Sequence, residues 1–161
     1  MGLARRAALA IQQKLGRTRS AHNWLDAPFV EATVTLMSID ATKLYDDSNI
    51  FARILRDELP SKKVYEDEHV LAFHDINPLA PTHILVIPKG AYVSWDDFSE
   101  KASDAEIAAL VRASGRIARE AGLVQSGYRM LSNTGRNSGQ EVPHLHLHLF
   151  AGQPLGPMLA R

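Results

Sequence analysis

The chain contains no cysteine in its 161 residues. This absence excludes disulfide scaffolds, thiolate zinc sites and cysteine nucleophiles together, and it leaves the redox state of the compartment open. Long apolar runs are lacking too, since no stretch approaches the ~20 residues that a membrane-spanning helix requires. The chain has no net charge either, with 18 basic and 18 acidic residues, and so no overall attraction to nucleic acid or anionic lipid. We therefore expect neither a membrane nor a nucleic acid as a partner.

The composition that remains fits one globular domain, with 45% apolar and 22% charged residues. The zero net charge hides an asymmetry, because residues 1–25 carry five basic residues and no acid. Residues 1–36 are therefore interpreted as a basic N-terminal extension outside the fold, with a second plausible start at Met37. The domain is expected at 37–152 and a C-terminal tail at 153–161. The alternative is that the extension, rich in Ala and Arg, is a mitochondrial transit peptide.

Periodicity and turn residues predict an α+β domain. A short N-terminal helix is expected after a cap at Ser48 or Asn49, and one long helix should begin at the capping box of residues 103–106 and end at Gly122. Strands are expected at residues 63–66, 70–74, 83–87, 128–131 and 142–150. Because strands dominate and one long helix crosses between them, the sheet should be mainly antiparallel.

The most informative motif alternates histidine with leucine in the last expected strand, where His144, His146 and His148 lie two residues apart. Alternate side chains of a strand share a face, so the three imidazoles should face one way and the leucines the core. Three imidazoles on one polar face have few structural reasons to exist, whereas histidine serves as nucleophile, acid and base near neutral pH. We therefore expect a chemical role.

Two chemistries compete for this face, a metal site and nucleophilic catalysis by histidine. Alternate strand residues are about 6.6 Å apart, so one zinc ion would reach two neighbours but hardly the outer pair, about 13 Å apart. A metal site would need further ligands, which His74, His83 or Asp75 could supply. The spacing weakens the metal interpretation without removing it.

The loop that precedes the histidines favours catalysis on a phosphate. Residues 132–142 are mostly small and polar, and Gly135 and Gly139 would let backbone N–H groups converge on an anion. Neutral side-chain donors in the loop are Asn133, Ser138 and Gln140. A phosphate cradle beside a histidine row predicts attack by an imidazole nitrogen on phosphorus, and hydrolysis of the phosphohistidine by water. His146, in the middle, is the expected nucleophile, with no metal ion or other cofactor.

These motifs together resemble the histidine triad (HIT) superfamily. Residues 144–150 fit its His-φ-His-φ-His-φ-φ signature, where φ is an apolar residue. Further segments resemble the histidine triad nucleotide-binding (Hint) branch: residues 50–51, 58–60, 64–67, 71–78, 80–88, 127–129 and 139–142. The closing residues 155–160 resemble the tail of bacterial members. The resemblance covers about residues 48–159 and implies a HIT-like fold, a homodimer and a cytoplasmic protein, or a mitochondrial one if residues 1–36 are a transit peptide.

The resemblance also implies an activity, hydrolysis of the P–N bond in purine nucleoside 5′-phosphoramidates such as conjugates of AMP with an amine. In the family pattern His146 is the nucleophile that forms a nucleotidyl-histidine. His148 would contact the α-phosphate, His144 would orient His146, and His83 would lie near the leaving group. A dinucleoside polyphosphate hydrolase and a nucleotide-binding regulatory protein are the alternatives.

Nucleotide contacts are implied in the same way. Asp75 would accept hydrogen bonds from the ribose hydroxyls. An apolar slot for the base would consist of Ile50, Phe51, Ile54, Phe73 and Ile76. The phosphate would be held by Asn133, Gly139, Gln140 and Glu141. Because the slot offers few hydrogen bonds, it should discriminate weakly between adenine and guanine.

Two positions depart from the family pattern. Glu141 stands where some members carry a serine that touches phosphate. Its carboxylate would repel phosphate, so contact is expected through its backbone N–H only. Pro143 stands where an aromatic residue is common, and it removes a backbone donor just ahead of the histidines.

Overall fold

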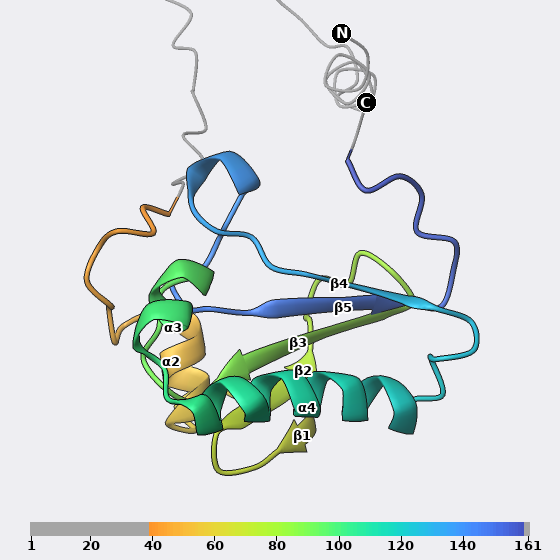
Figure 1. Ribbon diagram of the computed structural model, residues 1–161, viewed down its shortest axis with the longest axis horizontal. Helices are drawn as coiled ribbons and strands as arrows, with labels where there is room; N and C mark the ends of the chain where they lie inside the picture. Colours follow the sequence, from red (N-terminus) through yellow and green to blue (C-terminus); the bar gives the residue numbers. More distant parts are fainter. Residues whose placement is uncertain (1–38, 160–161) are drawn as a thin grey trace, which may run out of the picture. The chain divides into compact units, whose positions relative to one another are not determined.

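The computed structural model describes residues 39–159, so the interpretation of residues 1–36 concerns a segment outside the described part. Within it, five strands form one antiparallel sheet in the order β1-β2-β3-β5-β4 (Figure 1). In chain order the elements are α2 (Ile50–Leu55), β1 (Lys63–Glu66), β2 (Val70–His74), β3 (Thr82–Pro88), α3 (Trp95–Lys101), α4 (Asp104–Glu120), β4 (Tyr128–Leu131), the 3-10 turn η1 (Arg136–Ser138) and β5 (Leu147–Ala151). The expected α+β class is confirmed. No helix among these residues is both long and apolar enough to cross a bilayer.

Alternation along the central strands gives the sheet two apolar faces, because successive side chains point to opposite sides. One face is formed by Val70, Ala72, Ile84 and Val86, together with three residues of β5. The other is formed by Leu71, Phe73, Leu85 and Ile87. The helix α4 packs on the first face, and α2 packs on the second. The site described below therefore shares the α2 side of the sheet, since His148 lies opposite Leu85 in the register of β3 and β5.

The long helix α4 forms where its capping box predicts. The Ser103 N–H donates to a Glu106 carboxylate oxygen at 3.0 Å, and the Glu106 N–H donates to the Ser103 hydroxyl at 3.3 Å. Leu110 and Ile117, seven residues apart, lie on its buried side. Burial of each of these side chains contributes about 1.5–3 kcal/mol. The helix α4 thus covers one face of the sheet, and the histidines discussed below lie on the other face, which α2 covers in part.

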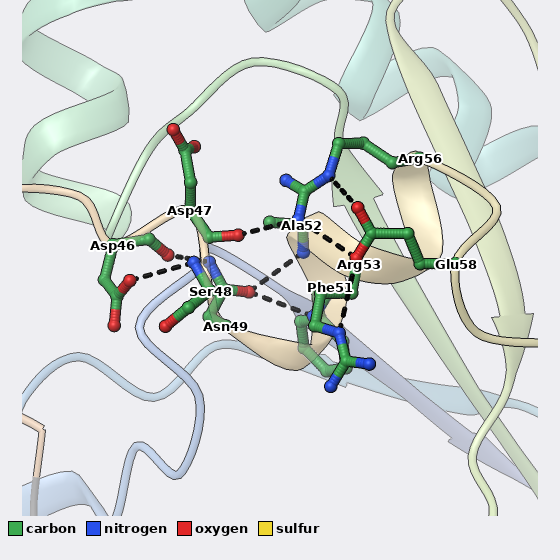
Figure 2. Close-up of polar contacts among 9 residues, drawn as sticks. All are labelled: Asp46, Asp47, Ser48, Asn49, Phe51, Ala52, Arg53, Arg56 and Glu58. Carbon is green, nitrogen blue, oxygen red and sulfur yellow. Dashed lines mark hydrogen bonds and ion pairs between the residues drawn. The ribbon is translucent and has the colours of Figure 1, made fainter.

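The short helix α2 is fixed at its start by Asn49, whose side-chain oxygen accepts from the N–H groups of Phe51 and Ala52 at 2.9 and 3.0 Å (Figure 2). Two side chains, Phe51 and Ile54, pack against the sheet from this helix. The expected cap and helix are confirmed. The Phe51 N–H is bonded to Asn49 and the Phe51 ring packs against the sheet, so this ring has a fixed position beside His146.

Two elements differ from expectation. The last strand was expected from residue 142, but β5 begins at Leu147. Pro143 has no N–H for the ladder, and the N–H of Leu145 donates to the carbonyl of Tyr92 at 2.7 Å. The helix α3 is an addition, capped by Ser94, whose hydroxyl accepts from the Asp97 N–H at 3.4 Å.

Candidate active site

The three histidines form a row that runs from the core to a cavity. The leucines between and after them, Leu145, Leu147 and Leu149, are buried in the cluster under α4, as the alternation predicts. The ring centroids of His146 and His148 are 4.9 Å apart. Only His148 belongs to β5, because the segment of residues 144–146 precedes the strand.

His146 is held in one tautomer by a backbone carbonyl. Its Nδ1 lies 2.7 Å from the carbonyl oxygen of His144. A carbonyl can only accept, so the proton is on Nδ1 and the lone pair is on Nε2. The residue is only 4% exposed, and burial lowers the pKa of His146 below its usual 6.5. At neutral pH it is therefore an uncharged imidazole with a free Nε2 lone pair, the state that a nucleophile requires.

His144 is locked from both sides of its ring. Its Nε2–H donates to the carbonyl of Pro88 at 2.9 Å, so Nδ1 is the acceptor of a hydrogen bond from the Tyr45 hydroxyl. His144 is completely buried, and burial lowers its pKa to about 4. It is thus neutral and inaccessible, a support for His146 rather than a reacting group. Tyr45 was missed by the sequence analysis, since 99 residues separate it from His144.

His83 and His148 are joined in a hydrogen-bonded chain with a fixed direction. The N–H of Leu79 donates to His83 Nδ1 at 3.3 Å, which puts the His83 proton on Nε2. His83 Nε2 lies 2.9 Å from His148 Nδ1 and donates to it. The His148 proton is then on Nε2, a buried atom with no hydrogen-bond partner among the described residues. Burial lowers the pKa of His148 to about 4, so this group is a neutral donor.

Asp75 lies beside this chain, with one carboxylate oxygen 3.5 Å from His83 Nε2. Its other oxygen accepts from the Asn77 N–H at 2.7 Å. One ligand atom from each of Asp75, His83 and His148 lies within 4.8 Å of the others, close enough for one metal ion. A metal on His83 Nε2 would move the ring proton to Nδ1, against the Leu79 N–H. The donor directions therefore suit hydrogen-bond donation from His148 Nε2 better than metal binding.

These residues meet at a cavity of about 540 Å³. Its lining includes His146, His148, His83, Asp75, Asn133, Gly139 and Glu141 from the expected set, together with Asn77, Leu79, Leu131 and Phe150. The only charged side chains in this lining are the two acids Asp75 and Glu141. A bound anion would therefore be held by neutral donors, as the sequence predicts.

The side chain of Gln140, an expected phosphate contact, is hydrogen-bonded to backbone groups. Its side chain is 2% exposed. The amide nitrogen donates to the carbonyls of Val93 and Val142 at 2.7 and 2.9 Å, and the amide oxygen accepts from the Gly135 N–H at 2.8 Å. All the polar atoms of this side chain are thus engaged in the loop, and it shapes the cavity wall from behind.

The residues expected to form the base slot fall into two groups. Phe51, Ile54 and Phe73 are buried together on the α2 side of the sheet. Ile50 and Ile76 are exposed, Ile76 to 84%. The Phe51 ring, with its centroid 5.2 Å from that of His146, connects the buried group to the histidines. Neither group lines the 540 Å³ cavity itself.

Comparison of the sequence with known protein families identifies the family of this chain. Residues 56–155, more than half of the chain, match the model of the HIT domain. The chain belongs to the HIT family. A 13.2 kDa HIT-like protein of Azospirillum brasilense is 66% identical over 119 residues, which are 74% of this chain and 98% of that protein.

Two further similar proteins are an enzyme of named activity and a protein of known structure. The purine nucleoside phosphoramidase of Escherichia coli K12 is 46% identical over 114 residues, 71% of this chain and 95% of the enzyme. The structure of a histidine triad protein from Clostridium difficile aligns with a TM-score of 0.61 at 45% identity, covering 68% of this chain and 95% of that one. The resemblance to the HIT superfamily is therefore confirmed. Tyr45 lies upstream of the residues that match the HIT model.

Proposed function

We propose that this HIT protein is a hydrolase that splits the P–N bond of purine nucleoside 5′-phosphoramidates through a nucleotidyl-histidine. The observation that carries the proposal is the hydrogen bond from His146 Nδ1 to the His144 carbonyl, which leaves Nε2 as a nucleophile beside the cavity. The 46% identity to a purine nucleoside phosphoramidase supports the choice of reaction.

In the first step His146 Nε2 attacks the α-phosphorus. A bond forms between Nε2 and phosphorus, and the P–N bond breaks with its electron pair leaving on nitrogen. The leaving nitrogen takes a proton from solvent water at the cavity, while the His83–His148 pair stays neutral and presents the His148 Nε2–H to the phosphate. In the second step water adds to phosphorus, His146 leaves with its electron pair, and the water proton returns to solvent. The products are a nucleoside monophosphate and an amine.

The His148 Nε2–H is the donor proposed for a non-bridging phosphate oxygen. It is a buried N–H without a partner among the described residues, and an unpaired buried donor costs about 1–3 kcal/mol. A phosphate oxygen would remove this penalty and would be stabilised further as charge develops in the transition state. Asn133, Gly139 and the backbone of Glu141, all at the same cavity, are proposed as the other phosphate contacts.

The nucleoside is proposed to extend from Asp75 toward α2. The Asp75 carboxylate lies at the cavity and would accept hydrogen bonds from the ribose hydroxyls. The exposed side chains of Ile50 and Ile76 would provide the apolar contact for the purine, and the buried cluster that includes Phe51, Ile54 and Phe73 would support the α2 side.

A homodimer is proposed from the edge of the sheet. Among the described residues the strand β4 pairs only with β5, so its other side is an open edge there, and folded proteins normally cover or protect such an edge. Beside it lies a largely apolar cavity of about 450 Å³ lined by Trp95, Met130, Leu131 and Leu147 among others. Light scattering should give twice the chain mass, and a monomer at every accessible concentration would contradict this part.

The decisive experiment compares His146→Asn with the wild-type protein on an adenosine 5′-phosphoramidate. Amine release should fall by about a thousandfold or more, while nucleotide affinity changes by less than about threefold. His69→Asn, at a histidine outside the cavity lining, is the matched control and should keep wild-type turnover. Full turnover by His146→Asn would refute the proposal. Faster turnover of a diadenosine polyphosphate than of the phosphoramidate would favour the alternative hydrolase.

A further inference from the structure

Tyr45 reaches the row of histidines from a part of the chain outside the HIT match. It lies four residues before Asn49, the cap of α2, and its side chain is half-buried. Its ring centroid is 5.4 Å from that of His144 in an edge-on arrangement, and its hydroxyl contacts His144 Nδ1. A segment that precedes the residues matched to the HIT model therefore contacts a residue of the signature.

The peptide that carries Tyr45 is pinned to α2 by the polar network in Figure 2. Arg56 donates to the carbonyl of Asp47 at 3.0 Å and to the carboxylate of Glu58 at 2.6 Å. The Asn49 amide donates to the carbonyl of Asp46 at 2.7 Å, and the Asp46 carboxylate accepts from the Ser48 N–H at 2.8 Å. The segment just after Tyr45 thus has a defined path, which directs the tyrosine inward.

The hydroxyl is the donor in this contact. Because the Pro88 carbonyl takes the His144 Nε2–H, the Nδ1 atom of His144 carries a lone pair and needs a donor. His144 is completely buried, so water does not reach it. Phe51 stands on another side, 6.1 Å from the His144 ring by centroids, and offers no polar group. Among the described residues, Tyr45 is the one that satisfies this nitrogen.

The segment of residues 144–146 depends on such contacts, because it lies outside the β5 ladder. It is held instead by the Tyr45 hydroxyl at His144, by the Tyr92 carbonyl at the Leu145 N–H, and by the Ser132 hydroxyl, which donates to the His146 carbonyl at 3.0 Å. The His144 carbonyl within this segment accepts from His146 Nδ1. Motion of the His144 ring therefore moves the acceptor that sets the His146 tautomer.

We infer that Tyr45 is a positioning residue for the nucleophile: its hydroxyl fixes the His144 ring, and the fixed His144 carbonyl keeps the proton of His146 on Nδ1. The inference rests on the proposed function, in which His146 Nε2 attacks phosphorus. It assigns part of the active-site support to a residue upstream of residues 56–155, which match the HIT model, and outside the signature motif.

The test is Tyr45→Phe, which removes one oxygen and keeps the ring. Nitrogen-15 NMR should show His146 as the single Nδ1–H tautomer in the wild-type protein and as a mixture of tautomers in the variant. The kcat for amine release, counted per active site, should fall by about tenfold, with KM changed by less than about twofold. Tyr65→Phe, at a half-buried tyrosine on β1 whose hydroxyl donates to Asp67, is the matched control and should leave both readouts at wild-type values.

A structural role alone would lower the melting temperature without moving the tautomer or kcat per active site, and that result would overturn the inference. If Tyr45→Phe does not fold, Arg56→Ala loosens the same segment and leaves the hydroxyl in place. It should shift the His146 tautomer in the same direction, whereas Arg116→Ala, which removes an exposed ion pair with Glu120 on α4, should not. An unchanged tautomer in Arg56→Ala would then count against the inference. The tautomer is measured without substrate, so its result stands even if the P–N hydrolysis proposal fails.

Discussion

Replacement of Gln140 by leucine separates a structural role from a phosphate-binding one. The change keeps the approximate volume of the side chain but removes its donors and its acceptor. Three groups then lose a partner: the carbonyls of Val93 and Val142 and the N–H of Gly135. Val93 is buried, whereas Val142 and Gly135 are partly accessible to water. The Gln140→Leu protein should therefore be less stable before any ligand is added.

The magnitude follows from these accessibilities. An unsatisfied buried group costs about 1–3 kcal/mol. With the full penalty at Val93 and about half of it at each of the other two, the total is twice the single-group penalty, so the free energy of unfolding should fall by about 4 kcal/mol. This is a large part of the ~5–15 kcal/mol that stabilises a typical domain. Urea unfolding at pH 7 measures it directly.

The matched control is Gln153→Leu, an exposed glutamine after β5, which should change the free energy of unfolding by less than about 0.5 kcal/mol. A loss below about 1 kcal/mol in Gln140→Leu, accompanied by weaker nucleotide binding, would refute the structural assignment. It would restore Gln140 to the phosphate contacts that the sequence suggests.

Three further predictions concern protons and metal ions. The rate of amine release should stay level as pH falls from 8 to 6.5 and decline only below that, because burial lowers the pKa of His146; a decline centred above pH 6.5 would contradict this. Burial of His144 lowers its pKa to about 4, so between pH 6.5 and 4 the unfolded chain binds a proton that the folded chain does not. The free energy of unfolding should therefore fall by about 3 kcal/mol over this range through His144 alone. An equally steep fall in His144→Asn would argue against this. Turnover should survive exhaustive dialysis against a chelator, because the Leu79 N–H holds His83 in the tautomer that donates to His148 and not in the one that would bind a metal through Nε2. Activity that returns only with added zinc would contradict this.

Local patterns in the sequence predict most of the framework. The strands at residues 63–66, 70–74 and 128–131 and the capping box of α4 form where alternation and capping residues indicate. These features depend on interactions within a few residues, so one segment of chain contains the information. The short helix α3 has Ser94, two acids in its first turn and Lys101 in its last turn as local signals, but its seven residues bury only one side chain, Phe98, so its apolar pattern is weak.

No local sequence pattern predicts the contacts that hold the histidines and the preceding loop in place. Alternation predicts that His144, His146 and His148 share a face, but it does not predict that His144 is completely buried. That burial depends on Tyr45 and on the Pro88 carbonyl, which lies 56 residues away in the chain. Gln140 likewise looks like a loop donor until the fold brings Val93 to its side.

The charge of the cavity follows the sequence expectation. The chain beyond residue 25 carries a formal charge of −5, and the charged residues that line the cavity are both acidic. A nucleotide phosphate would therefore meet neutral imidazole and backbone donors rather than lysine or arginine. Affinity for nucleotides should accordingly depend little on salt in comparison with a site built from cations.

The central claim, a covalent intermediate on the middle histidine, is tested most directly by intact-mass measurement after brief mixing with an adenosine phosphoramidate. The account predicts an added nucleotidyl group that maps to the peptide containing residues 144–148, sits on His146, and is absent from His146→Asn. Rapid turnover with no adduct at any mixing time, or an adduct on His83 or His148 instead, would contradict it.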